Sequence, residues 1–367
     1  MISIAKPIMG PEEIRSVIQV LKSGIIAQGP KVKELEKKFA RYCGIKYAVA
    51  FNSGTAALHA GLYALGIKKG DEVITTPFTF VATANVILML EAKPVFVDIN
   101  EGDFNINPHE VARKITKKTK AIIPVDLFGQ IYDYEGLKSV IGKHDIKILE
   151  DACQAIGAEH NGKKAGNFGD VSAFSLYATK NITCGEGGLI TTNNKIVMEQ
   201  CKMFRHHGQS EKKRYEYYDL GFNYRMTDIA AVITLAQLKK VDIFNKQRVT
   251  NARILSRGLQ NIKGLILPTV HVQNLHVFHQ YVIRITKDFK TTREKFMNYL
   301  IKKGIGCGIY YPKPLHLIYH LKKLGYRKGD FPVAEKVSQQ VLSLPIHPLV
   351  TRQELDFIIN TIRAYVG

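Results

Sequence analysis

The chain has 367 residues, of which 46% are hydrophobic and 23% are charged. This mixture is typical of a globular protein and excludes a disordered or fibrous one, and the length allows two or three domains. The 52 Lys and Arg residues exceed the 32 Asp and Glu residues, which gives a formal net charge of +20. The basic residues form short groups without a long basic tract or an aromatic RNA-binding motif. Solvated helix faces explain most of these charges, and an anionic small-molecule substrate is compatible with the basic balance. We expect no nucleic acid as a partner.

Other features of the sequence argue against a signal peptide, a membrane span, a disulfide framework and a metal site. Met1 leads through a single Lys6 into a stretch with Pro and Gly, without the apolar segment of a signal peptide. No apolar run reaches the length that crosses a bilayer. The five cysteines are widely spaced and contain no C-x-x-C pair. Two histidine pairs, His206 with His207 and His316 with His320, lack Cys or carboxylate partners at a metal-binding spacing. We expect a cytoplasmic protein with no membrane partner, no disulfide framework and no metal site.

Short β-rich runs alternate with helical patterns between residues 46 and 192. This alternation predicts a mostly parallel sheet covered by helices on both faces. Leu58, Leu62 and Leu65 recur at helical spacing and predict a helix over 54–65, directly after the first strand. The predicted strands are 47–51, 73–76, 95–98, 121–125, 146–149, 173–177 and 189–192.

The pattern changes beyond residue 240. We predict a strand over 281–285, a helix over 293–303 that ends at Gly304, and a helix over 333–342. Thr351 and Glu354 form a capping box before the apolar positions of a final helix. The expected fold is α/β, with a large domain at 1–245 and a smaller C-terminal α+β domain at 246–367.

Polar residues follow two of the predicted strands, at the edge where ligands gather in parallel α/β sheets. Ser53, Gly54 and Thr55 follow the first strand; a glycine permits close approach, and a hydroxyl meets the free amides of a helix N-terminus. Such a turn binds phosphate, although an ordinary helix cap is the alternative. Asp151 follows strand 146–149, and its buried carboxylate needs a cation such as a pyridinium nitrogen. Capping of the next helix is the alternative there.

Lys180 follows the predicted strand that contains Ser175, and a Gly-rich stretch comes after it at 185–188. A lysine that is desolvated at such a place has a lowered pKa, which favours Schiff-base chemistry. One lysine among many does not by itself identify a catalytic group.

Taken together, these motifs resemble those of the DegT/DnrJ/EryC1/StrS family of sugar aminotransferases. That family has the fold of the aspartate aminotransferase superfamily, which is fold type I among enzymes that depend on pyridoxal 5'-phosphate (PLP). The resemblance covers nearly the whole chain. Its motifs occur in order at 23–24, 28–30, 77–83, 150–154, 174–175, 180, 221–226, 311–316 and 342–345.

The resemblance implies that the chain binds PLP. Lys180 would hold the cofactor as a Schiff base and then act as general base and acid, and Asp151 would keep the pyridine nitrogen protonated. The other implied contacts are Gln154 with the phenolic oxygen, Phe80 with the ring face, Gly54, Thr55 and Ser175 with the phosphate, and Asn223 with the phosphate of the neighbouring subunit.

The resemblance also implies the reaction. An amino group would pass from glutamate to a keto group of a nucleotide-linked sugar, with C3 favoured over C4. Some members have His at the lysine position and are dehydratases, so Lys180 favours aminotransfer. Arg225 would bind a carboxylate of glutamate or of the sugar, because its planar fork suits that group. Tyr310, Tyr311 and His316 would contact the acceptor; domain packing is the alternative for Tyr311 and His316.

We expect a homodimer with shared active sites. The motif that contains Asn223 and Arg225 precedes a predicted helix whose apolar positions could bury a face against a second copy. These positions are Ile229, Val232, Ile233 and Leu235.

Two other classes of protein were weighed. A dinucleotide-binding protein fits the alternation of strands and helices, but the G-x-G-x-x-G motif is missing after the first strand. A non-catalytic regulatory protein of the same fold is suggested only by the net charge. The presence of Lys180, Asp151 and Gln154 argues against it.

Overall fold

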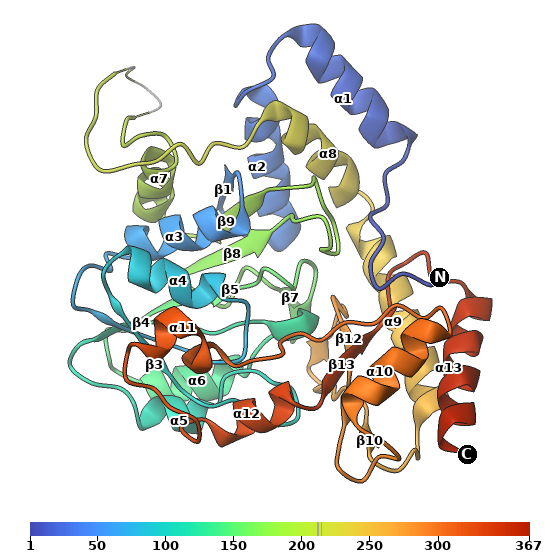
Figure 1. Cartoon of the computed structure of the whole chain (residues 1–367). Coiled ribbons are helices and arrows are strands. Elements are labelled where there is room, and N and C mark those ends of the chain that lie inside the picture. Colours follow the sequence, from blue (N-terminus) through green and yellow to red (C-terminus); the bar gives the residue numbers. More distant parts are fainter. Residues whose placement is uncertain (211–212, 214) are drawn as a thin grey trace.

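The structure is a computed structural model that describes residues 1–210, 213 and 215–367. Within these residues a seven-stranded sheet has the order β1-β9-β8-β5-β4-β2-β3 (Figure 1). Neighbouring strands are parallel except around β9, which is antiparallel to both β1 and β8. The predicted mostly parallel sheet is confirmed, with strand ends shifted by a few residues. The strands are β1 (Tyr47–Phe51), β2 (Glu72–Thr75), β3 (Lys93–Phe96), β4 (Thr119–Ile123), β5 (Lys147–Asp151), β8 (Val171–Ser175) and β9 (Gly188–Thr192).

The central strands are apolar on both sides because helices cover both faces of the sheet. Ile74 and Ile122 belong to one buried cluster, and their neighbours Val73 and Ile123 belong to another. Successive side chains of a strand point to opposite faces, so each strand contributes to two cores. One core is covered by α3 (Gly54–Ala64), α4 (Ala82–Met89) and α7 (Lys195–Phe204), and the other by α2 (Pro30–Cys43), α6 (Tyr134–Ile141) and α8 (Asp228–Leu238).

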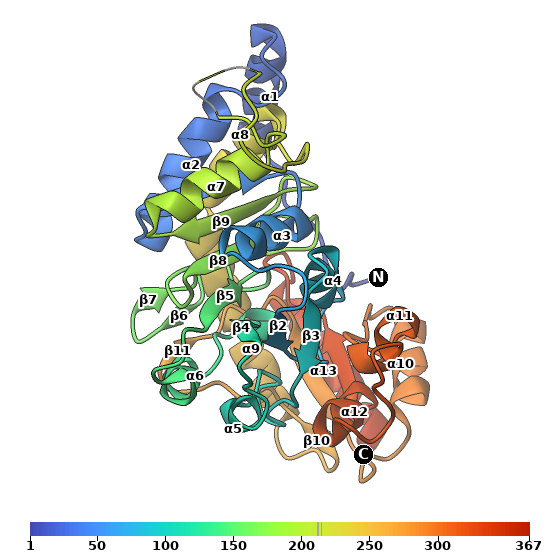
Figure 2. The same cartoon turned by 90° about the vertical axis from the view of Figure 1, so that its left-hand side faces the viewer.

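The helix that follows Met226 is α8, and it packs against α2 and against α1 (Pro11–Ser23) of its own chain. Figures 1 and 2 both show α1 at the end of the molecule, beside α8. Our expectation that Val232 and Leu235 face a partner is wrong, because both are buried within the chain. Ile229 and Ile233 are partly exposed.

The C-terminal region has its own antiparallel sheet, in the order β10-β12-β13. The predicted strand at 281–285 is confirmed, as is the capping box of Thr351 and Glu354. The helix predicted over 333–342 is wrong in its second half, because Val341 and Leu342 pair with β12 and are buried. The elements are α9 (Val241–Leu259), β10 (Leu265–Ile266), β12 (Tyr281–Ile285), α10 (Arg293–Lys302), α12 (Pro332–Ser338), β13 (Val341–Leu344) and α13 (Arg352–Val366).

The expected domain division at residue 245 falls inside α9, which continues without a break from 241 to 259. Ile2, near the N-terminus, belongs to the core of the C-terminal region. Its main-chain N–H donates a hydrogen bond to Gly304 O at 2.8 Å. The division at 245 therefore stays a prediction. Ile2, which that division assigns to the large domain, packs in the core of the C-terminal region.

A late segment of the chain returns to the large sheet. The main-chain N–H groups of Val333 and Ala334 donate to Asp98 at 2.8 and 2.9 Å, and Leu315 N donates to Pro77 O at 2.7 Å. This return brings residues 310–311 to the edge of the sheet where β5 and β8 end. The smaller elements are α5 (Pro108–Ala112), β6 (Glu159–His160), β7 (Lys163–Lys164), β11 (Asn274–Leu275) and α11 (Tyr319–Lys322).

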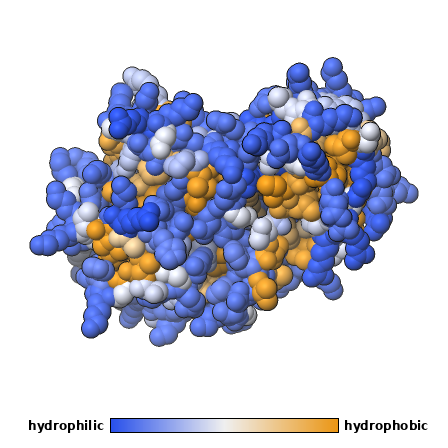
Figure 3. Space-filling view, turned by 90° about the horizontal axis from the view of Figure 1, so that it is seen from below, coloured by the Kyte–Doolittle hydropathy of each residue, from blue (hydrophilic) through white to orange (hydrophobic). Residues whose placement is uncertain are grey.

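The face seen in Figure 3 is mostly hydrophilic, with separate apolar areas between the polar side chains. Among the helices of the described residues, none combines the length and the apolar character needed to cross a membrane.

Candidate active site

A cavity of about 570 Å³ lies where β1, β5 and β8 end. We call it the Lys180 cavity. It collects side chains that are far apart in the sequence, as expected for the carboxyl ends of parallel strands. Of the predicted site residues, the structure brings nine together here: Gly54, Thr55, Phe80, Asp151, Gln154, Ser175, Lys180, Tyr310 and Tyr311.

One end of the cavity is formed by the N-terminus of α3. Ser53 caps this helix, and its Oγ accepts from Ala56 N at 3.1 Å. A Cβ atom at Gly54 would lie 2.9 Å from the Ser175 Cβ, so only glycine fits at this distance. The free amides and the dipole of the helix, together with the hydroxyls of Thr55 and Ser175, suit a phosphate group. Ser53 is therefore the cap of α3, and the phosphate site at Gly54 and Thr55 stays a prediction.

Asp151 lies in the floor of the cavity and is 4% exposed. Its Oδ2 accepts from Thr83 Oγ1 at 2.8 Å, and its Oδ1 accepts from Cys153 N at 3.2 Å. These two donors fix the carboxylate from opposite sides. A buried carboxylate held in this way suits a cationic ring nitrogen, which would supply the charge that burial otherwise penalises.

Lys180 lies in the wall of the cavity, on the turn after β8. Burial lowers the pKa of its amine, while the charges of Cys153 and Asp151 oppose that shift. The lower pKa increases the share of neutral amine, which is the form that attacks a carbonyl carbon. The neighbouring Asn181 anchors the turn, since its Nδ2 donates to Asn245 Oδ1 at 2.8 Å.

Gln154 and Phe80 border the remaining sides. Gln154 Nε2 donates to the Tyr311 hydroxyl at 3.2 Å, and its Oε1 accepts from Phe128 N at 3.0 Å. Phe80 is 56% exposed, with its ring centroid 6.4 Å from that of Tyr311. An exposed aromatic face above a buried polar floor suits a flat ring between them.

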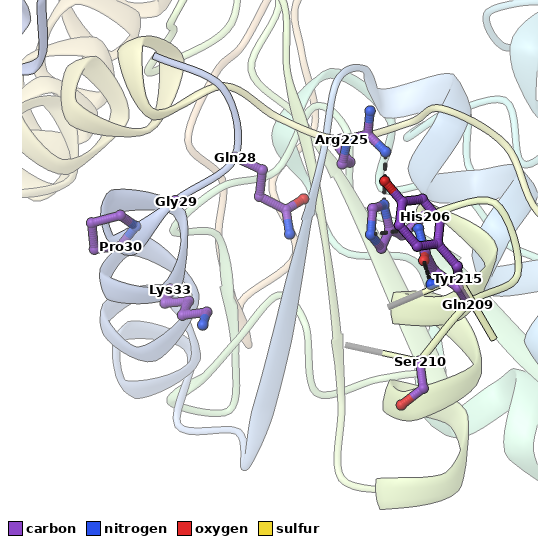
Figure 4. Close-up of a pocket in the computed structure, with 9 residues that line it drawn as sticks. All are labelled: Gln28, Gly29, Pro30, Lys33, His206, Gln209, Ser210, Tyr215 and Arg225. Atoms are coloured by element: carbon purple, nitrogen blue, oxygen red, sulfur yellow. Dashed lines mark hydrogen bonds between the residues drawn. The ribbon is translucent and has the colours of Figure 1, made fainter. Parts of the chain in front are cut away.

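Arg225 lies in a different pocket of about 590 Å³, which we call the Arg225 pocket (Figure 4). Arg225 Nη1 donates to His206 Nδ1 at 2.7 Å, and His206 Nε2 lies 2.9 Å from Gln209 Nε2. Lys33 adds another cation from α2 on the opposite side of the pocket. The lining residues are Gln28, Gly29, Pro30, Lys33, His206, Gln209, Ser210, Tyr215 and Arg225.

Asn223 is exposed and does not line the Lys180 cavity of its own chain. Its carbonyl accepts from Asn52 Nδ2 at 3.3 Å. Asn223 and Arg225 are thus separated from the other predicted site residues within one chain. A shared site formed by two chains stays a prediction.

His316 is not brought into the Lys180 cavity. Its ring is fully buried, with Nε2 3.0 Å from Glu335 Oε1 and its centroid 4.8 Å from that of Phe331. Burial lowers the pKa of His316, although Glu335 opposes that shift. Within one chain the geometry does not support our expectation of substrate contact for His316, and it fits the alternative of packing.

Sequence reasoning assigned no role to several residues of the two pockets. Thr83 lies in the motif at 77–83, so its hydroxyl could have been considered as a partner of Asp151. His279 and Gln280 reach the Lys180 cavity from a loop that carries no local signal, whereas Glu186 lies in the Gly-rich stretch at 185–188 and could have been considered. Lys33 and His206 likewise gave no pattern that distinguishes them from other surface cations.

The fold and the cavity define a class: a PLP-dependent enzyme of the aminotransferase type, with a lysine, a carboxylate and a phosphate-binding helix end around one space. Residues 7–363 match the model of the DegT/DnrJ/EryC1/StrS aminotransferase family. The chain belongs to this family, and it is a PLP-dependent sugar aminotransferase.

Individual relatives cover almost the whole chain. The spore coat polysaccharide biosynthesis protein SpsC of Bacillus subtilis is 39% identical over 98% of this chain and 96% of its own length. The GDP-perosamine synthase of Caulobacter vibrioides is 37% identical over 98% and 96%. The PLP form of the sugar aminotransferase Spr1654 from Streptococcus pneumoniae superposes with a TM-score of 0.93 at 30% identity, covering 99% of this chain and 98% of that one.

Proposed function

We propose that the protein transfers an amino group from glutamate to a keto group of a nucleotide-linked sugar, with C3 favoured over C4. The observation that carries the proposal is the convergence of Lys180, Asp151 and the α3 N-terminus on one cavity. The similarity to a GDP-perosamine synthase supports a nucleotide-linked sugar as the acceptor. The preference for C3 rests on the resemblance of the segment at 310–316, of which Tyr310 and Tyr311 line the cavity.

Each residue of the cavity has a task that follows from its geometry. PLP, when bound, withdraws electrons and so makes a proton on the carbon that carries the amino group easier to remove. The Lys180 Nζ atom takes and returns that proton. Asp151 holds a positive ring nitrogen, and Thr83 and Cys153 keep the Asp151 carboxylate in place. Gly54 lets the phosphate approach the α3 amides closely.

The Arg225 pocket supplies a second set of contacts under this proposal. Arg225 and Lys33 form a cationic surface that suits carboxylate or phosphate oxygens. Because these residues do not reach the Lys180 cavity of their own chain, we propose that they act in the cavity of a second copy. The protein would then be a homodimer with two shared sites.

The function is tested with purified protein and PLP. The expected result is a visible absorbance band that borohydride removes, followed by amine formation on a keto sugar from a panel of UDP-, GDP- and dTDP-linked compounds with glutamate. NMR of the product identifies the aminated carbon. Failure to form the band after incubation with PLP would contradict the proposal. Loss of a sugar hydroxyl without amine incorporation would indicate a dehydratase instead.

A further inference from the structure

A buried histidine of unassigned role also lines the Lys180 cavity. His279 is 7% exposed and lies just before β12. Its Nδ1 atom is buried and has no hydrogen-bond partner among the described residues. Buried polar atoms in native proteins are almost always paired, and an exception calls for an explanation. Among the histidines with such an Nδ1 atom, His279 is the one that lines the Lys180 cavity, within the described residues.

The backbone next to His279 is held in an uncommon conformation. Phe278 has a φ of 45°, in the left-handed region that residues other than glycine rarely adopt. Its ring stacks on His276 with centroids 3.9 Å apart, and Phe278 N donates to His276 Nδ1 at 3.0 Å. The buried Arg248 donates from Nη1 to Phe278 O at 3.1 Å and to His279 O at 3.4 Å. These contacts fix the direction of the His279 side chain.

The same segment is tied to the turn that carries Lys180. Asn181 Nδ2, in the residue after Lys180, donates to Val277 O at 3.1 Å. On the other side, Gln280 N donates to Phe128 O at 3.3 Å, and Phe128 also borders the cavity. The imidazole is therefore held against the cavity by contacts on both sides of it.

The charge state of the ring follows from its surroundings. Burial lowers the pKa of His279 well below its usual value, and the positive charges of Lys180 and Arg248 lower it further. A neutral imidazole has one nitrogen that accepts a hydrogen bond. The Lys180 amine, which also lines the cavity, is a hydrogen-bond donor. An acceptor without a partner among the described residues and a donor thus line the same cavity.

We propose that His279 is a positioning residue for Lys180, whose amine donates a hydrogen bond to the imidazole whenever the amine is not joined to the cofactor. The inference rests on the proposed function, because it requires that Lys180 be alternately joined to PLP and free. The four-carbon stem of Lys180 is flexible enough to bring the amine to the ring. His279 then keeps the released amine inside the cavity, ready to return.

The test measures the apparent pKa of the Lys180 amine, from the pH dependence of PLP attachment to full-length protein freed of cofactor. An acceptor stabilises the ammonium form, so its removal lowers this pKa. In His279→Phe we expect a fall of about one unit or more, with attachment at a given rate shifted to lower pH. His279→Gln retains an acceptor and should return the pKa toward the wild-type value. His347→Asn is the matched control, since it changes another buried histidine whose Nδ1 has no partner among the described residues and which does not line the cavity, and it should leave the pKa unchanged.

A wild-type pKa in His279→Phe, or an equal shift in His347→Asn, overturns the inference. If His279→Phe does not fold, two other measurements test the inference. These are the Lys180 pKa in His279→Gln and the pKa of the His279 ring, obtained by nitrogen-15 NMR titration of the wild-type protein. The His279 ring must remain neutral well below the usual histidine pKa, and protonation near that usual pKa overturns the inference. Failure of wild-type protein to attach PLP is a different result, because it refutes the proposed function itself.

Discussion

The Lys180 cavity and the Arg225 pocket have almost equal volumes, about 570 and 590 Å³, but they are built differently. The Lys180 cavity forms at strand ends, and buried hydrogen bonds fix its groups before any ligand binds. The Arg225 pocket lies between the start of α2 and the segment after α7 (Figure 4), and cations line it. The contrast indicates that one chain assembles the lysine, the carboxylate and the α3 N-terminus in one cavity, while the cations Arg225 and Lys33 lie outside that cavity.

The largest effect is expected for Lys180→Ala, which should abolish aminotransfer. Both the covalent attachment of PLP and the proton transfer need an amine at this point. The turnover rate and the borohydride-sensitive band should fall to background, while the thermal unfolding temperature stays near that of the wild type. The exposed Lys163→Ala serves as the control. Near wild-type turnover in Lys180→Ala without added amine would remove Lys180 from the mechanism.

Asp151→Asn tests the floor of the same cavity. A neutral amide does not stabilise a positive ring nitrogen, so we expect PLP to bind while kcat falls by roughly two to three orders of magnitude. Equilibrium binding of PLP and steady-state kinetics separate the two effects. An unchanged kcat would show that Asp151 only caps the following turn.

Thr83→Val should have a smaller effect of the same kind. A hydrogen bond to a charged group contributes about 1.5–3 kcal/mol, which corresponds to roughly ten- to a hundredfold in rate. Thr83 donates to Asp151 at 2.8 Å, so kcat should fall while the protein remains folded. Thr234→Val is the control, because the buried Thr234 hydroxyl donates to a helix carbonyl at 2.9 Å and lines neither pocket. Equal losses in both variants would indicate a general loss of packing.

The smallest effect is expected for Lys33, at the edge of α2 in the Arg225 pocket. Lys33 is an exposed cation on a flexible stem, and single contacts of this kind are weak. Lys33→Met should raise KM for the substrates several-fold, with kcat nearly unchanged. Lys37→Met removes a cation one turn further along α2 that does not line the pocket, and it should leave KM unchanged. A similar KM in both variants would mean that the pocket does not contact a substrate.

The sequence predicted the large sheet because its strands are short, β-branched and bounded by turn residues, as in β2 and β4. It also predicted which strand ends carry chemistry, since polar residues such as Asp151 directly follow apolar runs. The helix over 333–342 was predicted wrongly because Val337 and Val341 have helical spacing. Pairing of Val341 with β12 then overrides that local preference.

The contacts that the sequence did not reveal depend on tertiary packing. His316 follows Tyr311 closely in the chain, yet Phe331 and Glu335 enclose its ring away from the cavity. His279 gave no pattern at all, because its position depends on the buried Arg248 and on the conformation of Phe278. Ile2 joins the C-terminal core through a parallel β-bridge to Ile305, and no local sequence pattern predicts this contact.

Subunit exchange between two inactive variants tests most directly whether two chains share each site. Arg225→Ala and Lys180→Ala should each be nearly inactive as homodimers, the former because it removes the proposed charge-assisted contact with a carboxylate of the substrate. In a heterodimer of the two, one site combines intact Lys180 with intact Arg225, and the other site carries both defects. Aminotransfer should therefore recover toward half of the normal number of sites in each heterodimer. If verified heterodimers form and no activity returns, Arg225 acts within its own chain, and the shared-site account is contradicted.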